Sequence, residues 1–589
     1  MAHTGMRVLL LHPEDSPWSG AWSRESWDLV ADLGFASTHT YEQWGHRLGT
    51  RVLSVHQYAG EMEGYRWVDQ VLEHGRGRLL DRMGLDWWEL LGVWSYQELH
   101  ALYMLDAFLR MELYSERIEL AATRPHLFSR ILGIALGRPV SYSRADSGPV
   151  RRASRILRSA RKLRPAQIAE IAFDKWDPGY RLRRHFKRSS RANLKSPSVL
   201  LPSSYSNVTR AALAYAEQLP HRQFLLAATR RSALSDRLPD NVTTTSLAAY
   251  ALPSSETQAE TSDLQEAWRV FRRTTLLEVK EFRYAADAGL WDYFPAHLEN
   301  GLHLREAWRQ LLECESVTGV LCGDDLNYYT RLPLILARHS GLGAVYCSHG
   351  ALDCGLLFKM PLADSYLLRG EMERDYLQRA RPIEPEKIRV GAPGKKLFFN
   401  AADRRDGPLV FFSQPYEVAG GRADEIYREL LPRLCSIAQR SGRRLMIKLH
   451  PFESQWARKE LVTSILAKDV CGRVDIVGGV SPEKLISRAW CGVTVDSSVA
   501  VECALQKVPF FLCGWLDFTG TGYLRQFARF GVGRVLSAPE DIESIPQMVA
   551  DYRPDSAVIE RLWHESDTAD LDEVLFGTRQ VALPQRCAS

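Results

Sequence analysis

The sequence lacks several features that would assign the chain to a familiar class. No run of about 18 apolar residues occurs among its 589 residues, so we expect no membrane-spanning helix. The apolar run Met6–Leu11 meets His12 and Pro13 too early for a signal peptide, and we expect it to be the first strand of a Rossmann-like domain. The ten cysteines include no Cys-x-x-Cys pair, which argues against a zinc ribbon or a redox pair. Scattered cysteines beside apolar runs favour reduced thiols and a cytoplasmic location.

Familiar nucleotide and metal motifs are missing as well. No Gly-x-Gly-x-x-Gly follows a predicted strand and no P-loop occurs, which disfavours a dehydrogenase or a P-loop enzyme. The one Asp-x-Asp triplet, Asp570–Asp572, follows no predicted strand, and we interpret it as a solvated acidic stretch. Asp324 and Asp325 are adjacent, so their side chains would diverge on an extended chain. We therefore expect neither a metal ion nor a cofactor.

Positive charge is concentrated in one segment. The apolar and charged fractions, 45% and 25%, are ordinary for a soluble protein. Residues 151–195 hold fifteen Lys or Arg and three Asp or Glu, so this segment carries +12 and the rest of the chain −8. The segment could be a solvated helix face. It could also bind anionic phospholipid headgroups, a lipid pyrophosphate or an acidic glycan, which would make the protein peripheral to the inner membrane face. Nucleic acid is disfavoured because no nucleic-acid-binding motif accompanies the charge.

Predicted strands and helices alternate along most of the chain. Short apolar runs such as Val317–Cys322 and Gly343–Cys347 are each followed by a helical pattern, which predicts an α/β fold with parallel sheets. A chain of this length needs more than one core. We expect a Rossmann-like domain over residues 1–399 with a basic insertion at about 150–260, a linker at 400–407, a second Rossmann-like domain at 408–560 and a tail at 561–589. We expect the Ser/Thr/Pro-rich residues 235–260 to form an exposed loop, and a helix near the C-terminus to cross back to the first domain.

Two segments of the second domain point to one sheet edge. The predicted strand Leu445–Leu449 runs into His450-Pro451, and proline holds the preceding residue in an extended turn. The predicted strand Gly492–Val495 is followed by Asp496-Ser497-Ser498 and the helical pattern Val499–Gln506. Either segment alone is commonly a plain turn or cap. Together they place an imidazole and a helix N-terminus at the carboxyl edge of a parallel sheet, where ligands bind, and so predict a nucleotide-phosphate site.

These motifs carry a family resemblance. KLHP and DSSVAVECALQKVPFFL resemble the paired His-Pro and Ser-Ser motifs of bacterial surface-polysaccharide transferases. The group includes the capsule Kdo transferases, the polysialyltransferases and, more distantly, the CDP-glycerol glycerophosphotransferases. The resemblance covers about residues 317–513, a third of the chain. It implies a GT-B fold, in which two Rossmann-like domains face a cleft, and transfer of a sugar or glycerol-phosphate-like unit from a nucleotide donor, cytidine-based by analogy. The implied acceptor is a growing polysaccharide or lipid-linked glycan.

The motifs and the resemblance together suggest roles for individual residues. His450 should donate to the nucleotide phosphate, Ser497 and Ser498 should bind its oxygens, and Lys448 should add charge. The remaining nucleotide-binding candidates are Glu502, for ribose hydroxyls, and Gln414, in the loop after the first strand of the second domain. Histidine suits proton abstraction near neutral pH, so His349 ranks first as general base, ahead of Asp353 and Asp325. The stretch around His349, SHGALDCG, departs from the Gln-His-Gly or Thr-His-Gly of close relatives. On the acceptor side the candidates are His12, Glu14 and Asp325.

Two alternatives stay open. A UDP-GlcNAc 2-epimerase-type enzyme would share the fold but needs additional acid-base carboxylates, which the sequence does not identify. A protein without catalytic activity could instead use the two domains to bind glycan or partners at a membrane.

Overall fold

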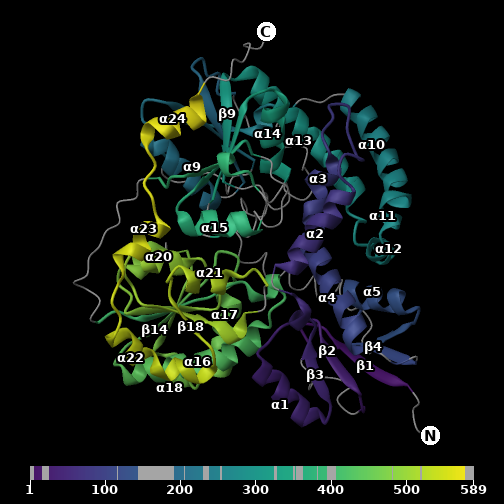
Figure 1. Ribbon diagram of the computed structural model, residues 1–589, viewed down its shortest axis with the longest axis vertical. Coiled ribbons are helices and arrows are strands. Elements are labelled where there is room, and N and C mark those ends of the chain that lie inside the picture. Colours follow the sequence, from purple (N-terminus) through teal and green to yellow (C-terminus); the bar gives the residue numbers. More distant parts are fainter. Residues whose placement is uncertain are drawn as a thin grey trace. The chain divides into compact units, whose positions relative to one another are not determined.

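The computed structural model is traced in Figure 1. It describes residues 5–15, 25–60, 62–113, 115, 117–142, 191–204, 206–229, 238–251, 255–323, 328–348, 352, 363–380, 383–393, 406–479, 482–517 and 520–577. The chain divides into two compact units. The first unit comprises residues 1–64, 100–146 and 396–563, and the second comprises residues 65–99, 147–395 and 564–589.

The first unit contains two parallel sheets. The five-stranded sheet has the order β3-β2-β1-β4-β5. Its strands are β1 (Met6–Leu11), β2 (Leu29–Asp32), β3 (Arg51–Ser54), β4 (Ile118–Ala122) and β5 (Val140–Tyr142), and its helices include α1 (Thr38–Leu48), α4 (Tyr96–Glu112) and α5 (Leu127–Leu136). The predicted strand Met6–Leu11 is the central strand, and Val8 and Leu10 are fully buried in it. A continuous apolar run suits a strand covered on both faces.

The six-stranded sheet of the first unit has the order β15-β14-β13-β16-β17-β18. Its strands are β13 (Leu409–Phe412), β14 (Leu445–Lys448), β15 (Val474–Val477), β16 (Cys491–Thr494), β17 (Phe510–Cys513) and β18 (Arg534–Leu536). The helices around it include α16 (Ala423–Arg440), α17 (Gln455–Ile465), α18 (Lys468–Cys471), α19 (Pro482–Ile486), α20 (Val499–Leu505), α21 (Tyr523–Arg529), α22 (Ile545–Ala550) and α23 (Ser556–Leu562) (Figure 1). Its core joins strand residues such as Phe411 and Val493 to α16 residues such as Leu430 and Leu434.

The second unit is built on a seven-stranded parallel sheet of order β12-β11-β10-β9-β6-β7-β8. The strands are β6 (Ser198–Ser203), β7 (Gln223–Ala228), β8 (Val242–Ser246), β9 (Val317–Cys322), β10 (Gly343–Cys347), β11 (Ser365–Leu368) and β12 (Ile388–Val390). The helices include α2 (Glu63–His74), α3 (Trp87–Leu91), α9 (Ser206–Gln218), α10 (Ser255–Arg273), α11 (Thr275–Glu278), α12 (Lys280–Asp287), α13 (Phe294–Cys314), α14 (Tyr328–His339), α15 (Glu371–Ala380) and α24 (Thr568–Phe576).

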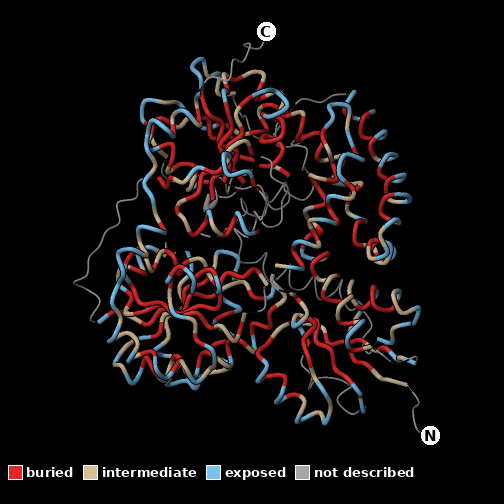
Figure 2. Tube along the Cα trace, in the orientation of Figure 1, coloured by how far each residue is buried: buried red, intermediate tan, exposed pale blue. Residues whose placement is uncertain are grey.

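A helical layer of the second unit has its own aromatic core. The rings of Trp268 and Phe294 stack with centroids 4.0 Å apart, and Trp88 packs beside Phe294 at 5.8 Å. Stacked aromatic pairs of this kind supply much of the apolar contact in a core. In Figure 2 the buried positions run along the strands and the inward sides of the helices, while the exposed positions lie on the outer sides.

The expected α/β class with parallel sheets is confirmed, because every pairing between named strands is parallel. In all three sheets the chain starts at an inner strand, moves to one edge and then returns to fill the other side, as in doubly wound folds. Among the described residues, no helix combines the length and apolar character needed to cross a bilayer.

The expected segmentation differs from the sheets observed. Residues expected in one domain, 1–399, carry two separate sheets. The strands β6, β7 and β8 fall inside the segment expected as an insertion, yet they pair within the seven-stranded sheet. The exposed loop expected at residues 235–260 is wrong, because it contains β8 and the start of α10. The Thr-rich β8 is an edge strand, and an edge strand needs few apolar residues.

As expected, the C-terminal helix α24 returns to the part of the chain before residue 400, which here is the sheet of the second unit. Leu571 and Leu575 of α24 are buried in the core of the seven-stranded sheet. Asp572 is not part of a solvated stretch, because Arg222 donates to both of its carboxylate oxygens at 2.6 Å. The basic residues 151–190 and the residues 400–405 of the expected linker lie outside the described part of the chain.

Candidate functional site

The six-stranded sheet provides the candidate site through its topology. β13 is an inner strand, and its neighbours β14 and β16 are reached by connections to opposite sides. In such a sheet, the loops after the two strands at the reversal diverge and leave a crevice at their carboxyl ends. Here those strands are β13 and β16, and β14 lies on the other side of β13. The segments Ser413–Arg422, Leu449–Ser454 and Val495–Ser498 therefore surround one sheet edge.

His450 is held in a defined orientation after β14. Its backbone N–H donates to Glu453 Oε2 at 2.7 Å, and its ring Nδ1 accepts the backbone N–H of Phe452 at 3.2 Å. Because Nδ1 is an acceptor, the neutral ring carries its proton on Nε2. Burial, and secondarily the charge of Lys448, lower the pKa of His450 below its ordinary value. In the absence of a ligand, the imidazole is thus a neutral N–H donor at neutral pH.

A buried ion network, absent from the predicted site residues, holds this turn. The side chain of Glu453 is 1% exposed and accepts the Ser413 hydroxyl and Arg458 Nε, each at 2.7 Å. The other two nitrogens of the Arg458 guanidinium donate to the Glu417 carboxylate at 2.8 and 2.7 Å. The loops after β13 and β14 are therefore tied to α17 by charge-assisted hydrogen bonds. The available signal was the glutamate three residues after His450, at the spacing of a turn.

Lys448 ends β14 and is largely buried. Its ammonium donates to the carbonyl of Leu449 at 2.5 Å. Burial lowers its pKa, and the carboxylate of Glu453 opposes that change. The cation therefore lies at the same sheet edge as His450.

The serine pair follows β16. Ser497 and Ser498 are half-buried, and α20 begins at Val499, as expected. Ser498 is the N-cap residue, but its backbone is helical (φ −61°, ψ −11°) and its hydroxyl caps no N–H. Ser497 Oγ accepts the Val499 N–H at 3.4 Å. With only seven residues, α20 offers a small dipole. The two hydroxyls are thus the polar groups of interest here.

Gln414 and Asp496 join the two loops at the reversal point. Gln414 Nε2 donates to Asp496 Oδ1 at 2.5 Å, and the Asp496 N–H donates to Gln414 Oε1 at 3.3 Å. Both ends of the Gln414 side-chain amide are therefore hydrogen-bonded to the loop after β16. Glu502 is half-buried on α20, one turn beyond Ser498.

The structure brings His450, Lys448, Gln414 and the two serines to one sheet edge. β14 and β16 flank β13, so His450 and the serine pair are about two strand spacings, roughly 10 Å, apart. His349, Asp353 and Asp325 lie outside the described residues. Among those that are described, no group of three or more His, Cys, Asp or Glu side chains is arranged to hold a metal ion.

His12 and Glu14 lie at the carboxyl edge of a different sheet, the five-stranded one. His12 Nδ1 accepts the Glu14 N–H at 3.2 Å, and the His12 ring lies 4.8 Å from that of His126. Burial and the nearby Arg124 lower the pKa of His12. Arg124 pairs with Glu14 at 3.1 Å and also with the buried Asp15.

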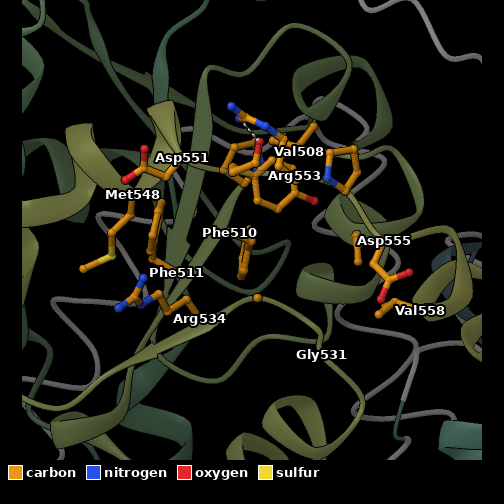
Figure 3. A pocket seen from close by; sticks show the side chains of 15 residues that line it. Val508, Phe510, Phe511, Gly531, Arg534, Met548, Asp551, Arg553, Asp555 and Val558 are labelled. Atoms are coloured by element: carbon orange, nitrogen blue, oxygen red, sulfur yellow. Dashed lines mark hydrogen bonds between the residues drawn. The ribbon is translucent and has the colours of Figure 1, made fainter.

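A separate cavity of about 240 Å³ lies at the opposite edge of the six-stranded sheet (Figure 3). Its lining includes Phe510, the first residue of β17, and Arg534, the first residue of β18, so it faces the amino ends of these strands. None of the predicted site residues lines it.

Comparisons with known proteins find weak similarity to several solved structures. No protein-family model matches the sequence, and no curated protein matches it significantly. A UDP-GlcNAc 2-epimerase from Methanocaldococcus jannaschii aligns at 13% identity over 64% of this chain and 98% of that one, with a TM-score of 0.39. Acinetobacter baumannii MurG aligns at 13% identity over 64% and 99%, with a TM-score of 0.36. Phytolacca americana UGT2, solved with UDP-2-fluoro-glucose and pterostilbene, aligns at 14% identity over 64% and 94%, with a TM-score of 0.36. At these values the likeness assigns no activity to the chain.

Proposed function

We propose that the carboxyl edge of the six-stranded sheet binds the phosphates of a nucleotide-activated sugar, and that the protein is a glycosyltransferase of GT-B type. The observation that carries this proposal is the placement of a fixed imidazole N–H donor, a lysine and two serine hydroxyls around one reversal point of a doubly wound sheet. Donors of this kind match phosphate oxygens, and such a reversal point is the usual ligand position.

In this proposal each residue has a distinct task. His450 Nε2–H donates to a phosphate oxygen, and the negative charge of the phosphate raises the pKa of the ring, so the imidazole binds more tightly as a cation. Ser497 and Ser498, about 10 Å from His450, donate hydroxyl hydrogens to other phosphate oxygens of the same ligand. Lys448 adds positive charge. Glu502 accepts from the ribose hydroxyls.

Sugar transfer requires that the leaving nucleotide be stabilised as negative charge develops on its phosphate. His450 and the serines supply hydrogen bonds that strengthen as that charge grows. A base at His349, Asp353 or Asp325 would take the proton of the acceptor hydroxyl. We propose a cytidine nucleotide as donor, a cell-surface polysaccharide or glycolipid as acceptor, and no metal ion.

Nucleotide binding provides the first test. Titration calorimetry of the full chain with CMP, CDP, UDP and GDP should identify one preferred base. His450→Ala should weaken that binding by about 10–100-fold, the value of one hydrogen bond to a charged group. His339→Ala, an exposed histidine on α14, is the matched control and should bind as the unaltered chain does. Equal affinities for the two variants would remove His450 from the site.

Product analysis separates the three candidate functions. A transferase releases free nucleotide and places labelled sugar in the polymer or lipid fraction. A 2-epimerase instead converts the nucleotide sugar to its isomer, and a binding protein leaves it unchanged. Isomer formation without transfer would replace our proposal with the epimerase.

A further inference from the structure

The five-stranded sheet has its own reversal point, between the carboxyl ends of β1 and β4. By the general rule for doubly wound sheets, a ligand would be expected in this crevice. The guanidinium of Arg422, which precedes α16 of the six-stranded sheet, lies beside this point, at the carboxyl ends of β1 and β2. Its Nη1 donates to the carbonyl of Asp15 at 2.9 Å, and its Nη2 donates to the carbonyl of His12 at 3.0 Å.

The same guanidinium forms a bidentate ion pair with Asp32, the last residue of β2. Arg422 Nε lies 2.5 Å from Asp32 Oδ2, and Nη2 lies 2.8 Å from Oδ1. The side chains of Arg422 and Asp32 are 6% and 0% exposed. Asp32 also accepts the Tyr41 hydroxyl at 2.8 Å, and the guanidinium lies 5.1 Å from the Trp44 ring. A bidentate pair of this geometry fixes orientation as well as neutralising charge.

Backbone bonds extend the attachment along the loop. The Phe35 N–H donates to the Gly420 carbonyl at 3.0 Å, and the Arg422 N–H donates to the Phe35 carbonyl at 2.7 Å. Gly420 has φ 87°, and a Cβ there would lie 2.8 Å from the His56 ring, so the loop fits closely against this surface.

The attached loop, Ser413–Arg422, is the one that begins at the candidate phosphate site. At its start, Ser413 bonds to Glu453 and Gln414 bonds to Asp496. In its middle, Glu417 pairs with Arg458. At its end, Arg422 is held by the five-stranded sheet. One side of the phosphate site is therefore continuous with the contacts of Arg422 to Asp32, Asp15 and His12 on a second sheet, which we call the clamp.

We propose that Arg422 and Asp32 are positioning residues for the nucleotide site, and that the five-stranded sheet holds the Ser413–Arg422 loop in place. The backbone carbonyl of His12 is then one of the acceptors that hold Arg422. The inference rests on the proposed function, because the loop matters for activity only if the phosphate site is used.

The test compares Asp32→Asn with Asp424→Asn in the full chain. Asp424 is exposed on the first turn of α16, two residues from Arg422, and serves as the matched control. We expect Asp32→Asn to speed hydrogen exchange of amides 414–421 at least tenfold and to weaken binding of the preferred nucleotide about tenfold. The KM for the donor should rise accordingly, while kcat at saturation changes less than threefold. Arg422→Lys keeps the charge but loses the bidentate geometry. Its loop exchange rate and donor KM should lie between those of Asp32→Asn and Asp424→Asn.

Tyr41→Phe is a milder variant in case Asp32→Asn does not fold. It removes one hydrogen bond to Asp32 and should speed loop exchange by a smaller factor. Loop exchange and donor KM equal to those of Asp424→Asn, in a chain with a lowered melting temperature, would show a merely structural contact and overturn the proposal. If the unaltered chain binds no nucleotide, the proposed function fails, and the exchange measurement alone still decides whether the clamp orders the loop.

Discussion

Removing the Glu453 carboxylate is the sharpest test of how the His450 turn is held. Glu453→Ala deletes three hydrogen bonds, from His450 N–H, Ser413 Oγ and Arg458 Nε. Ser413 keeps the Tyr427 hydroxyl, 2.6 Å away, as an alternative partner. Arg458 keeps Glu417, so it is not left as an uncompensated charge. The substitution therefore leaves two donors, the His450 N–H and Arg458 Nε, without this acceptor, at a cost of about 1–3 kcal/mol each.

We therefore expect Glu453→Ala to lower the free energy of unfolding of the six-stranded domain by about 3 kcal/mol. Glu453→Gln, which retains one acceptor oxygen, should lose about half as much. Urea unfolding read by hydrogen exchange of peptides from residues 409–465 reports this domain directly. Glu460→Ala, at an exposed position on α17, is the control. Equal urea midpoints for the Glu453 and Glu460 variants would refute the assignment of the network.

Two further predictions concern stability. Burial lowers the pKa of His56 and of His100 to about 4, so between pH 6.5 and 4 the unfolded chain binds more protons than the folded one. The free energy of unfolding should be greatest above about pH 6.5 and should fall by about 1.4 kcal/mol per pH unit for each histidine as the pH drops towards 4. His56→Gln should reduce the slope of the urea midpoint against pH. An unchanged slope would contradict this. In the second unit, a methyl group at Gly301 would overlap the buried Trp87 ring. Gly301→Ala should destabilise by about 1–3 kcal/mol despite alanine's higher helix propensity, whereas Gly472→Ala, where the nearest atom is the Asp469 carbonyl oxygen at 3.9 Å, should be neutral or stabilising in the same thermal-melt assay.

Strands with buried apolar runs could be predicted well from the sequence. Met6–Leu11, Val317–Cys322 and Gly343–Cys347 are strands with the expected bounds. Each is a short apolar run that ends at a polar or glycine-containing turn, and this pattern depends only on local residues. The edge strand β8, with the sequence VTTTS, and the start of α10 were missed because their residues are mostly polar, and the buried ones among them, such as Thr245 and Glu260, give no apolar pattern.

Which strands share a sheet could not be predicted. Every run has the same apolar character, whereas pairing depends on contacts between distant segments. For the site, the residues adjoining strand ends could be placed from strand and turn patterns alone. Glu453 and Arg458 were within reach of a local spacing argument. Arg422 was not, because nothing near it in sequence signals Asp32, which lies 390 residues earlier.

That separation has a consequence for synthesis of the chain. Asp32 leaves the ribosome long before its arginine partner exists, and at about 5–20 residues per second the delay is roughly 20–80 s. During this interval the Asp32 carboxylate must stay hydrated, since the cation that later neutralises it has not been made. The clamp can therefore close only after most of the polypeptide has been translated, and docking of the first-made sheet becomes a late event in maturation.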